Sequence, residues 1–266
     1  MKYSVITINF NNVEGLRKTI KSVVGQTFND YEYIVIDGGS TDDSVSVIKE
    51  NSDRINYWVS EPDGGIYNAM NKGVAHAHGD YCIFMNSGDC LYSHMVLEQV
   101  DALHATEDII IGRLCSEDES QMLFDPPLSG KITLYYLYSS TVPHQSSFIR
   151  TTLLRLYPYD EKLKIVSDWK FFVQTIVMHH CSVRYSDELV AKFDTCGLST
   201  SNPVEMWREK EQVLTSMFPL RVIEDYKAMK ASECLTQTIT PQLRQHYRID
   251  KILYQIGNIM LKFIKR

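Results

Sequence analysis

Residues 31–44 read YEYIVIDGGSTDDS, and this stretch indicates the fold class. Its first seven residues form an apolar run rich in β-branched side chains, which predicts a strand that ends at Asp37. Gly38 and Gly39 break the strand, and the Ser-Thr-Asp sequence at 40–42 is typical of the start of a helix. A strand that passes through glycines into a capped helix is the repeating unit of α/β folds.

The same alternation continues on both sides of this stretch. Four further runs have the composition of strands, at residues 4–10, 55–60, 81–85 and 108–114. We therefore predict an α/β fold with a mostly parallel central sheet flanked by helices on both faces. Ligands of such folds bind outside the carboxyl ends of the strands. Polar turns with glycine follow three of these ends, at residues 37–40, 61–65 and 86–89.

The second half of the sequence is less regular. Ser167 and Asp168 precede an apolar run that extends to residue 178, which predicts the start of a helix. Residues 182–193 contain two short strand-like pieces, and residues 203–218 are predicted to be helical.

The charge of the chain is unevenly distributed. The net charge is −6, and residues 240–266 carry +5 while residues 1–239 carry −11. An acidic body argues against a general nucleic-acid binder, which presents a basic surface. The six cysteines contain no CxxC pair, which favours reduced thiols in a cytosolic protein. The amino terminus has no signal-peptide pattern, and no stretch approaches the roughly 20 apolar residues of a spanning helix, so we expect a cytoplasmic protein.

Four blocks of sequence resemble those of one enzyme family. In order they read SVITINFNN (4–12), QTFNDYEYIVIDGGSTDDS (26–44), SEPDGGIYNAMNKGVAHAHGDY (60–81) and FMNSGD (84–89). In this order and spacing the chain resembles the family 2 glycosyltransferases, densely over residues 4–89 and more thinly to about residue 199. The resemblance implies the GT-A fold, a Rossmann-like fold of nucleotide-diphospho-sugar transferases. It also implies inverting transfer of a hexose or N-acetylhexosamine to an acceptor hydroxyl.

The resemblance further implies the organisation and the partners of the chain. Residues 1–115 are expected to form the nucleotide-sugar-binding half, residues 116–200 the acceptor-binding half of the same domain, and residues 201–266 a helical C-terminal extension. The expected donor is a nucleotide-diphosphate sugar, with a UDP-sugar favoured. The expected acceptor is a glycan or a lipid-linked molecule, and the implied setting is surface-polysaccharide or lipopolysaccharide assembly.

The resemblance implies a nucleotide-sugar pocket. Its expected residues are Asp37, Gly38, Asp63, Asn71, Lys72, Asn86 and Ser87. Asp37 is expected to lie toward the nucleoside, and Gly38 admits a ligand close to the backbone. Without the resemblance, residues 37–43 are equally an ordinary capped turn, and Lys72 is equally an ordinary exposed lysine.

The chain departs from the usual family pattern at two positions. Many members have a second acid where this chain has Gly38, and they have a metal-binding acid where it has Gly88. Asp89 is the one acid left in residues 86–89, so we expect it to hold Mg²⁺ or Mn²⁺ with Asn86 as an oxygen contact. Without the resemblance, these four residues are typical of a turn.

The second half supplies the expected acceptor side. Asp168 matches the family's acceptor-side acid, and an inverting transferase needs a general base to take the proton of the attacking hydroxyl. The alternative is that Asp168 only begins a helix. His144 lies in a Pro-His-Gln segment that resembles an acceptor-side loop, and the alternative is a structural histidine. Residues 196–199 (CGLS) resemble a late motif that closes over the donor.

Residues 242–266 are predicted to form an amphipathic helix. Its apolar residues recur every three or four positions, namely Ile249, Ile252, Leu253, Ile256, Met260, Phe263 and Ile264. One interpretation is an interfacial helix attracted to anionic lipid at the inner face of the membrane. The other is a helix that packs on its own domain or on another subunit of a homo-oligomer.

Three other classes of protein are alternatives to a glycosyltransferase. A nicotinamide dehydrogenase needs G-x-G-x-x-G after the first strand, where residues 9–15 read NFNNVEG. A sugar nucleotidyltransferase needs a loop rich in glycine and arginine at the same place, which this chain lacks. A non-catalytic or metal-independent nucleotide-sugar-binding protein of the same fold stays open, because an altered metal motif is what such a protein would show.

Overall fold

The computed structural model describes residues 1–125, 127, 131–194 and 202–232. The chain divides into two compact units, of which the first is Met1–Val213 and the second begins at Leu214. The sheet and the candidate site belong to the first unit. The motif at 196–199 and the amphipathic segment 242–266 lie outside the described residues.

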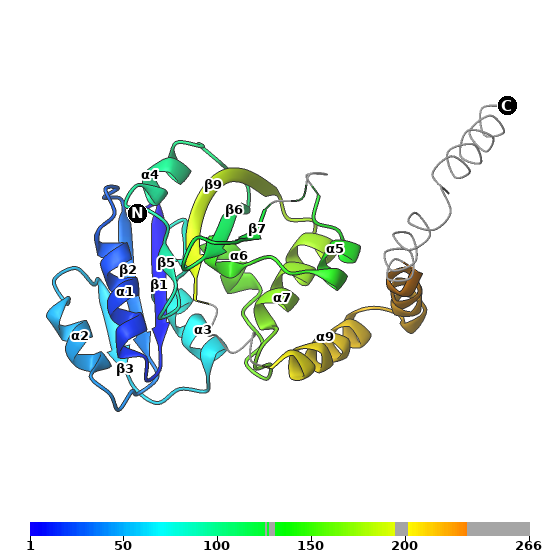
Figure 1. The fold of residues 1–266 in the computed structure, drawn as a ribbon, viewed down its shortest axis with the longest axis horizontal. Helices are drawn as coiled ribbons and strands as arrows, with labels where there is room; N and C mark the ends of the chain where they lie inside the picture. The colour runs from blue at the N-terminus through cyan, green and yellow to red at the C-terminus, as the bar shows by residue number, and fades with distance from the viewer. Residues whose placement is uncertain (126, 128–130, 195–201, 233–266) are drawn as a thin grey trace. The chain divides into compact units, whose positions relative to one another are not determined.

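Four parallel strands form the first half of the sheet, in the order β3-β2-β1-β4 (Figure 1). Their bounds are β1 Tyr3–Asn9, β2 Tyr31–Asp37, β3 Tyr57–Ser60 and β4 Tyr81–Phe84. Every residue of β1 and β4 is buried, as is typical of parallel strands that helices cover on both faces.

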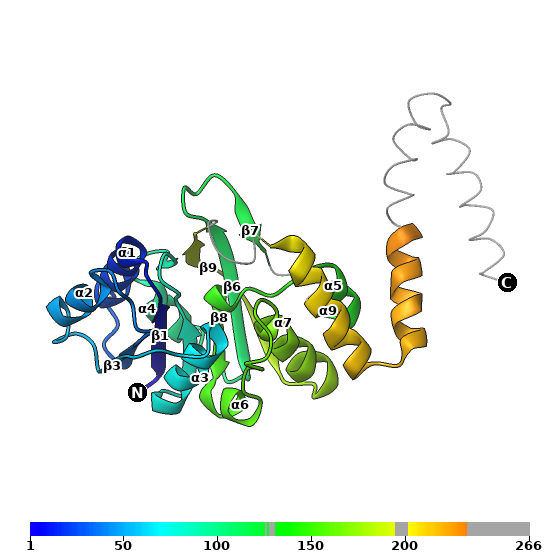
Figure 2. The same cartoon turned by 90° about the horizontal axis from the view of Figure 1, so that it is seen from below.

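Three helices connect these strands and lie on opposite faces of the sheet. Helices α1 (Val13–Val24) and α2 (Ser44–Glu50) share one face, whereas α3 (Ile66–His76) covers the other (Figure 2). Right-handed crossovers explain this arrangement, because the chain moves from β1 to β2 to β3 and then returns past β1 to β4. The strand order therefore reverses between β1 and β4, and folds of this kind bind ligands outside the carboxyl ends at such a point.

The second half of the sheet mixes parallel and antiparallel pairs. Its strands are β5 Cys90–Leu91, β6 Ile109–Ser116, β7 Met122–Phe124, β8 Ser147–Arg150 and β9 Val183–Phe193. Strand β8 is antiparallel to both β4 and β6, while β9 is parallel to β6. The two strand-like pieces predicted in residues 182–193 form one strand. Register shifts between Ile111 and Leu114 of β6 absorb the irregular pairing without ending β9.

Short helices fill the connections of the second half. They are α4 Val96–Asp101, α5 Leu134–Ser139, η1 His144–Ser146, α6 Thr151–Leu156, α7 Ser167–Phe172, η2 Val173–Met178 and α9 Pro203–Met217. Helix α7 begins at Ser167, as predicted. The apolar run that follows is not one regular helix, because it continues from Val173 as the π-helical segment η2. Thr175 Oγ1 donates to the carbonyl of Phe171 within this segment, a contact that often bends helices.

These elements confirm the α/β fold with helices around a central sheet, which is parallel in its first half and mixed in its second. The large side chains of Trp169, Phe148 and Phe84 are fully buried in its core. Among the described cysteines, Cys82, Cys90, Cys115 and Cys181 are free thiols. Within the described ranges, no helix has the length and apolar character needed to cross a membrane.

Candidate active site

The register of the sheet brings polar side chains together at its carboxyl edge. Asn9 at the end of β1 lies opposite Asp37, and Asp37 lies opposite Ser60 at the end of β3. The Asp37 carboxylate accepts hydrogen bonds from Asn9 Nδ2 (2.7 Å), Ser60 Oγ (2.6 Å) and both N and Oγ of Ser40 (2.9 and 2.6 Å). Burial raises the pKa of Asp37, but these hydrogen bonds outweigh burial and hold the pKa below its ordinary value. Asp37 therefore fixes the geometry of this edge.

Two other side chains pack closely against Gly38 at this edge. A Cβ atom at position 38 would lie 2.9 Å from Asp63 Oδ2 and 3.3 Å from the ring of Phe10. Asp63 is partly exposed, and its Oδ1 accepts a hydrogen bond from Gly65 N at 2.8 Å. Phe10 is 65% exposed. Sequence reasoning did not select Phe10, because its exposure is evident only in the fold. A carboxylate thus borders position 38 although this chain lacks the second acid there.

Asn71 and Lys72 of α3 contact protein groups in this structure. Asn71 Nδ2 donates to the backbone oxygen of Tyr159 (2.9 Å) and to Glu161 Oε1 (2.8 Å), and Asn71 Oδ1 accepts from Tyr159 N (3.0 Å). Lys72 Nζ donates to Glu61 Oε1 at 2.8 Å. Asn71 therefore ties α3 to the chain that precedes α7, and Lys72 forms an ion pair with Glu61.

Residues 86–89 form a turn after β4 in which Asp89 faces a second aspartate. Gly88 has a φ of +110°, and a Cβ atom there would lie 2.7 Å from Asp194 Oδ2. Asp89 Oδ1 accepts a hydrogen bond from Asp194 N at 3.0 Å. Asp89 is 4% exposed, and burial raises its pKa to about 6. Two carboxyl groups therefore lie close to Gly88, and sequence reasoning missed Asp194 because it lies 105 positions further on.

Asn86 and Ser87 have different surroundings within this turn. The backbone oxygen of Ser87 accepts a hydrogen bond from Asn12 Nδ2 at 3.0 Å. Asn86 Nδ2 lies 3.2 Å from His144 Nε2, while Asn86 Oδ1 is buried and has no hydrogen-bond partner among the described residues. A buried amide oxygen without a partner is costly, so this atom is a suitable contact for an added ligand.

Asp168 lies at the centre of a chain of hydrogen bonds. Its Oδ2 lies 3.0 Å from His144 Nδ1, and its Oδ1 accepts a hydrogen bond from the Tyr67 hydroxyl at 3.0 Å. Burial raises the pKa of Asp168, but its contacts with His144, Tyr67 and the backbone of Trp169 hold the pKa below its ordinary value. Through His144 this series of hydrogen bonds extends to Asn86, which follows β4. The structure therefore brings together three predicted site residues, Asp168, His144 and Asn86.

Three other predicted residues gather elsewhere on the same edge. Asp37, Gly38 and Asp63 form a separate group at the ends of β2 and β3. Tyr67, which sequence reasoning did not select, comes from α3 and contacts Asp168 across a separation of 101 residues.

Two buried charged residues of α9 lie beside the start of α7, and sequence reasoning missed both. The Glu209 carboxylate accepts hydrogen bonds of 2.7 to 3.2 Å from the backbone N–H groups of residues 164–166. Lys210 Nζ lies 4.9 Å from the centroid of the Trp169 ring. Burial lowers the pKa of Lys210 to about 8, although the charge of Asp168 acts in the opposite direction. Helix α9 therefore places one anion and one cation against the segment that carries Asp168.

The residues around Gly88 offer oxygen ligands for a hard divalent cation. Asp89 and Asp194 supply carboxylates, and Asn86 Oδ1 is an unpaired buried oxygen. Mg²⁺ is commonly held by one or two carboxylates together with substrate phosphates. In the part of the chain that the structure describes, no cluster of three or more His, Cys, Asp or Glu side chains could hold an ion. The residues present fit a cation whose other ligands come from a diphosphate.

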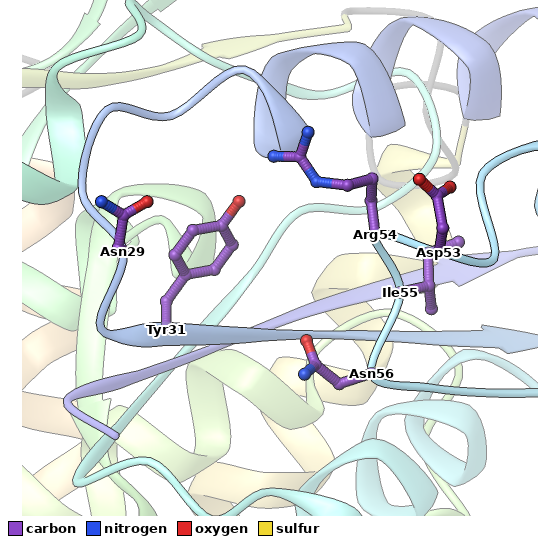
Figure 3. A pocket seen from close by; sticks show the side chains of 6 residues that line it. All are labelled: Asn29, Tyr31, Asp53, Arg54, Ile55 and Asn56. Carbon is purple, nitrogen blue, oxygen red and sulfur yellow. The ribbon is translucent and has the colours of Figure 1, made fainter.

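A polar hollow lies at the opposite edge of the sheet (Figure 3). It is lined by Asn29, Tyr31, Asp53, Arg54, Ile55 and Asn56. Tyr31 begins β2, so the hollow lies at the amino ends of the strands. The Tyr31 hydroxyl and Arg54 Nη2 donate to the backbone oxygens of Val23 and Val24 at the end of α1. None of the predicted site residues lines this hollow, and its polar groups hold α1 against the sheet.

Comparison with known proteins identifies the family. The model of glycosyl transferase family 2 matches residues 4–156. The chain belongs to glycosyltransferase family 2. This glycosyltransferase is 35% identical over 207 residues to an uncharacterised glycosyltransferase of Mycobacterium tuberculosis (strain CDC 1551 / Oshkosh), covering 74% of this chain and 76% of the relative. It is 24% identical over 229 residues to a PGL/p-HBAD biosynthesis glycosyltransferase of Mycobacterium bovis (strain BCG / Pasteur 1173P2), covering 83% and 88% of the two chains.

Solved structures share the fold of this family 2 glycosyltransferase. S. aureus TarS superposes with a TM-score of 0.65 at 17% identity, covering 80% of this chain and 39% of TarS. TarS 1–349 in complex with UDP-GlcNAc has a TM-score of 0.62 at 19% identity, covering 73% and 58%. The mannosyltransferase PcManGT from Pyrobaculum calidifontis, in complex with GDP-Man and Mn²⁺, has a TM-score of 0.56 at 16% identity, covering 73% and 57%. The family and these structures confirm the GT-A fold.

Proposed function

We propose that the protein is an inverting glycosyltransferase that moves a hexose or N-acetylhexosamine from a UDP-sugar to a hydroxyl of a glycan or lipid-linked acceptor. Membership of family 2 supports the reaction class. The TarS complexes with UDP and UDP-GlcNAc favour a UDP-sugar as donor. The relative named for PGL/p-HBAD biosynthesis supports a biosynthetic role, which we place in surface-polysaccharide or lipopolysaccharide assembly.

The observation that carries this proposal is the environment of Asp168. The side chain is 17% exposed, and each of its oxygens already contacts one hydrogen-bond donor, on His144 or Tyr67. The backbone N–H group of Trp169 is a third contact, so of the about four lone-pair sites of an ionised carboxylate one stays available for an acceptor hydroxyl. In the reaction the acceptor oxygen bonds to the anomeric carbon as the bond from that carbon to the diphosphate oxygen breaks. The diphosphate leaves with the electron pair, and the hydroxyl proton passes to Asp168.

The donor would lie along the strand ends. In this arrangement Asp63, which lies beside Gly38, accepts a hydrogen bond from the base, and Asp37 holds this edge of the sheet in place. The ring of Phe10 also lies beside Gly38, and because it is exposed it is available for stacking on the base. The remaining proposed donor contacts are Asn71, Lys72, Asn86 and Ser87.

A divalent cation, Mg²⁺ or Mn²⁺, fits the residues beside Gly88. Asp89 and Asp194 would hold it together with the diphosphate of the donor. The bound cation would neutralise charge on the leaving diphosphate. PcManGT was solved with Mn²⁺ and a nucleotide sugar, which supports use of such a cation here.

The proposal also covers the organisation and location of the chain. Residues 1–115 would bind the donor, residues 116–200 the acceptor, and residues 201–266 would form the C-terminal extension. His144 would lie on the acceptor side because it contacts Asp168. We place the protein in the cytoplasm at the inner face of the membrane, with the basic residues of 240–266 as the contact with anionic lipid.

The test replaces Asp168 by asparagine, which keeps the size of the side chain and removes the base. Release of UDP from UDP-GlcNAc and UDP-glucose is measured with Mn²⁺, and binding of UDP is measured by calorimetry. We expect Asp168→Asn to lower turnover by about 10² to 10⁴ and to leave UDP affinity nearly unchanged. Asp187→Asn is the matched control, because Asp187 is an exposed acid of β9.

Two outcomes would contradict this proposal. Unchanged turnover in Asp168→Asn would remove Asp168 from the chemistry. Tight UDP binding without UDP release from any nucleotide sugar of a wide panel would instead favour the non-catalytic nucleotide-sugar-binding protein.

A further inference from the structure

Tyr67 contacts Asp168, the candidate general base. It comes from α3, which belongs to the first half of the sheet, whereas Asp168 comes from the second half of the chain. Tyr67 is the second residue of α3 and is 4% exposed. Its hydroxyl donates a hydrogen bond to Asp168 Oδ1 at 3.0 Å. Because an ionised carboxylate only accepts hydrogen bonds, the direction of this bond is fixed.

The second oxygen of Asp168 is held from a different element. His144 Nδ1 lies 3.0 Å from Asp168 Oδ2, and His144 Nε2 lies 3.2 Å from Asn86 Nδ2. A neutral His144 that carries its proton on Nδ1 satisfies both contacts, since Nδ1 then donates to Asp168 while Nε2 accepts from Asn86. Tyr67 and His144 thus bind opposite oxygens of one carboxylate, and together they fix its rotation about the Cβ–Cγ bond.

Tyr67 also lies close in the chain to Asp63, the residue that we propose contacts the base of the donor. Helix α3 begins directly after Gly65, whose N–H group donates to Asp63 Oδ1 at 2.8 Å. Gly65 and Tyr67 are two positions apart in the chain, so Asp63 and Tyr67 belong to one short segment. This segment reaches from the proposed donor contact Asp63 to Asp168.

We propose that Tyr67 is a positioning residue, which orients the carboxylate of Asp168 so that a free lone pair faces the acceptor hydroxyl. This inference rests on the proposed function, because it assumes that Asp168 is the base. Tyr67 itself takes no proton in the reaction, and its effect on turnover passes through Asp168 alone.

Among the described residues, four ionisable groups interact with Asp168. His144 of η1 and Tyr67 of α3 contact its oxygens, while Lys210 of α9 and the hydroxyl of Tyr159 interact with its charge. Tyr67 donates to the charged form of Asp168 and so lowers its pKa. Loss of the Tyr67 hydroxyl is therefore expected to raise the pKa of Asp168, and the base then stays protonated up to a higher pH.

The test compares two tyrosines that lie side by side. Tyr67→Phe removes one hydroxyl and keeps the ring, whose centroid lies 5.6 Å from that of Tyr159. Tyr159→Phe is the matched control, because the buried Tyr159 hydroxyl has no hydrogen-bond partner among the described residues. Release of UDP from UDP-GlcNAc with Mn²⁺ is measured as a function of pH for both variants, and the pKa of Asp168 is measured by carboxyl ¹³C NMR.

We expect Tyr67→Phe to lower kcat about tenfold at neutral pH, with little change in the KM for UDP-GlcNAc. The acid limb of kcat/KM and the NMR pKa of Asp168 should both move up by about half to one pH unit. Tyr159→Phe should keep the wild-type kcat and acid limb. A Tyr67→Phe variant with the wild-type kcat, or with an unshifted pKa of Asp168, would overturn the inference.

A double-mutant cycle separates this inference from the proposed function. If Tyr67 acts through Asp168, Tyr67→Phe should cause no further loss of turnover in an Asp168→Asn background. An additional tenfold loss in that background would show that Tyr67 acts elsewhere and would overturn the positioning role. If Asp168→Asn alone keeps full turnover, the proposed base fails, whatever Tyr67→Phe does.

Discussion

Two aspartates at the carboxyl ends of the strands have opposite surroundings. Asp37 is fully buried, and Asn9, Ser40 and Ser60 donate to its carboxylate. Asp63 is partly exposed, and its carboxylate accepts a hydrogen bond from the N–H group of Gly65. At the scale of single residues, we therefore propose that Asp37 mainly stabilises this edge and that Asp63 mainly contacts the donor.

Asp37→Asn is expected to lower the free energy of unfolding at neutral pH by about 1–3 kcal/mol, because an amide NH₂ group then faces buried donors. The pKa of Asp37 is lowered in the folded state, so its charge stabilises the fold above the ordinary value of 3.8. This stabilisation is lost as the pH falls through the folded pKa. Urea unfolding at several pH values should therefore show a difference between wild type and Asp37→Asn that is large at pH 7 and shrinks below about pH 4.

Asp63→Asn is the companion variant for this measurement. An asparagine oxygen still accepts from Gly65 N, so stability should stay within about 0.5 kcal/mol of wild type. UDP affinity should fall about tenfold, because the carboxylate that we propose accepts a hydrogen bond from the uracil base is lost. Wild-type UDP affinity in Asp63→Asn would contradict the assignment of Asp63.

At the scale of elements, helix α9 braces helix α7. Glu209 accepts three backbone hydrogen bonds from residues 164–166, which immediately precede Ser167 and Asp168. Trp169 Nε1 donates to the backbone oxygen of Leu137 at 2.8 Å and anchors α7 from its other side. The position of Asp168 thus depends on contacts made by neighbouring elements as well as on the sequence of α7 itself.

Glu209→Ala is expected to destabilise the protein by about 3 kcal/mol, because buried N–H groups lose their acceptor. The amides of residues 164–166 should also exchange with solvent faster, which hydrogen-exchange NMR can measure. Glu205→Ala is the matched control on the same helix. Glu205 forms a surface ion pair with Arg208 at 3.5 Å, and such pairs contribute little. Unaltered exchange at residues 164–166 in Glu209→Ala would contradict the bracing role of α9.

At the scale of the whole molecule, the charge is divided along the chain. Residues 1–239 carry −11, and residues 240–266 carry +5. An acidic body is repelled by an anionic membrane, whereas each Lys or Arg near such a surface contributes about 1 kcal/mol of attraction. The basic segment is therefore the part of the chain suited to bind anionic lipid, and it lies outside the described residues.

Deletion of residues 242–266 is expected to abolish sedimentation with vesicles that contain phosphatidylserine. Binding of UDP should persist, because the predicted donor residues all lie in Met1–Val213. Vesicles of phosphatidylcholine alone provide the control. If the full chain ignores anionic vesicles and the deletion instead lowers the oligomeric state, the segment packs on another subunit.

The fold and part of the site follow from local patterns in the sequence. Asn9, Asp37 and Ser60 each end an apolar strand, and parallel pairing of those strands places them side by side. The start of α7 was predictable in the same way, because Ser167 and Asp168 precede an apolar run. These features depend on the order of neighbouring residues, which sequence spacing describes directly.

The contacts between distant segments could not be predicted in this way. Tyr67 lies 101 positions from Asp168, and Asp194 lies 105 positions from Asp89. Nothing in the spacing of these residues distinguishes them from other buried or partly buried side chains. Glu209 is another example, since an acid in the middle of a polar helix normally faces solvent.

The sequence by itself determined the family, the α/β fold and the edge of the sheet on which the polar turns gather, because each of these depends on strand and helix periodicity and on ordered motifs. Only the tertiary structure decided which groups hold the candidate base. Tyr67, His144 and Glu209 reach Asp168 or the segment before it from α3, η1 and α9. The physical reason is that hydrogen bonds act over about 3 Å in space, and the packing of elements determines which distant residues come that close.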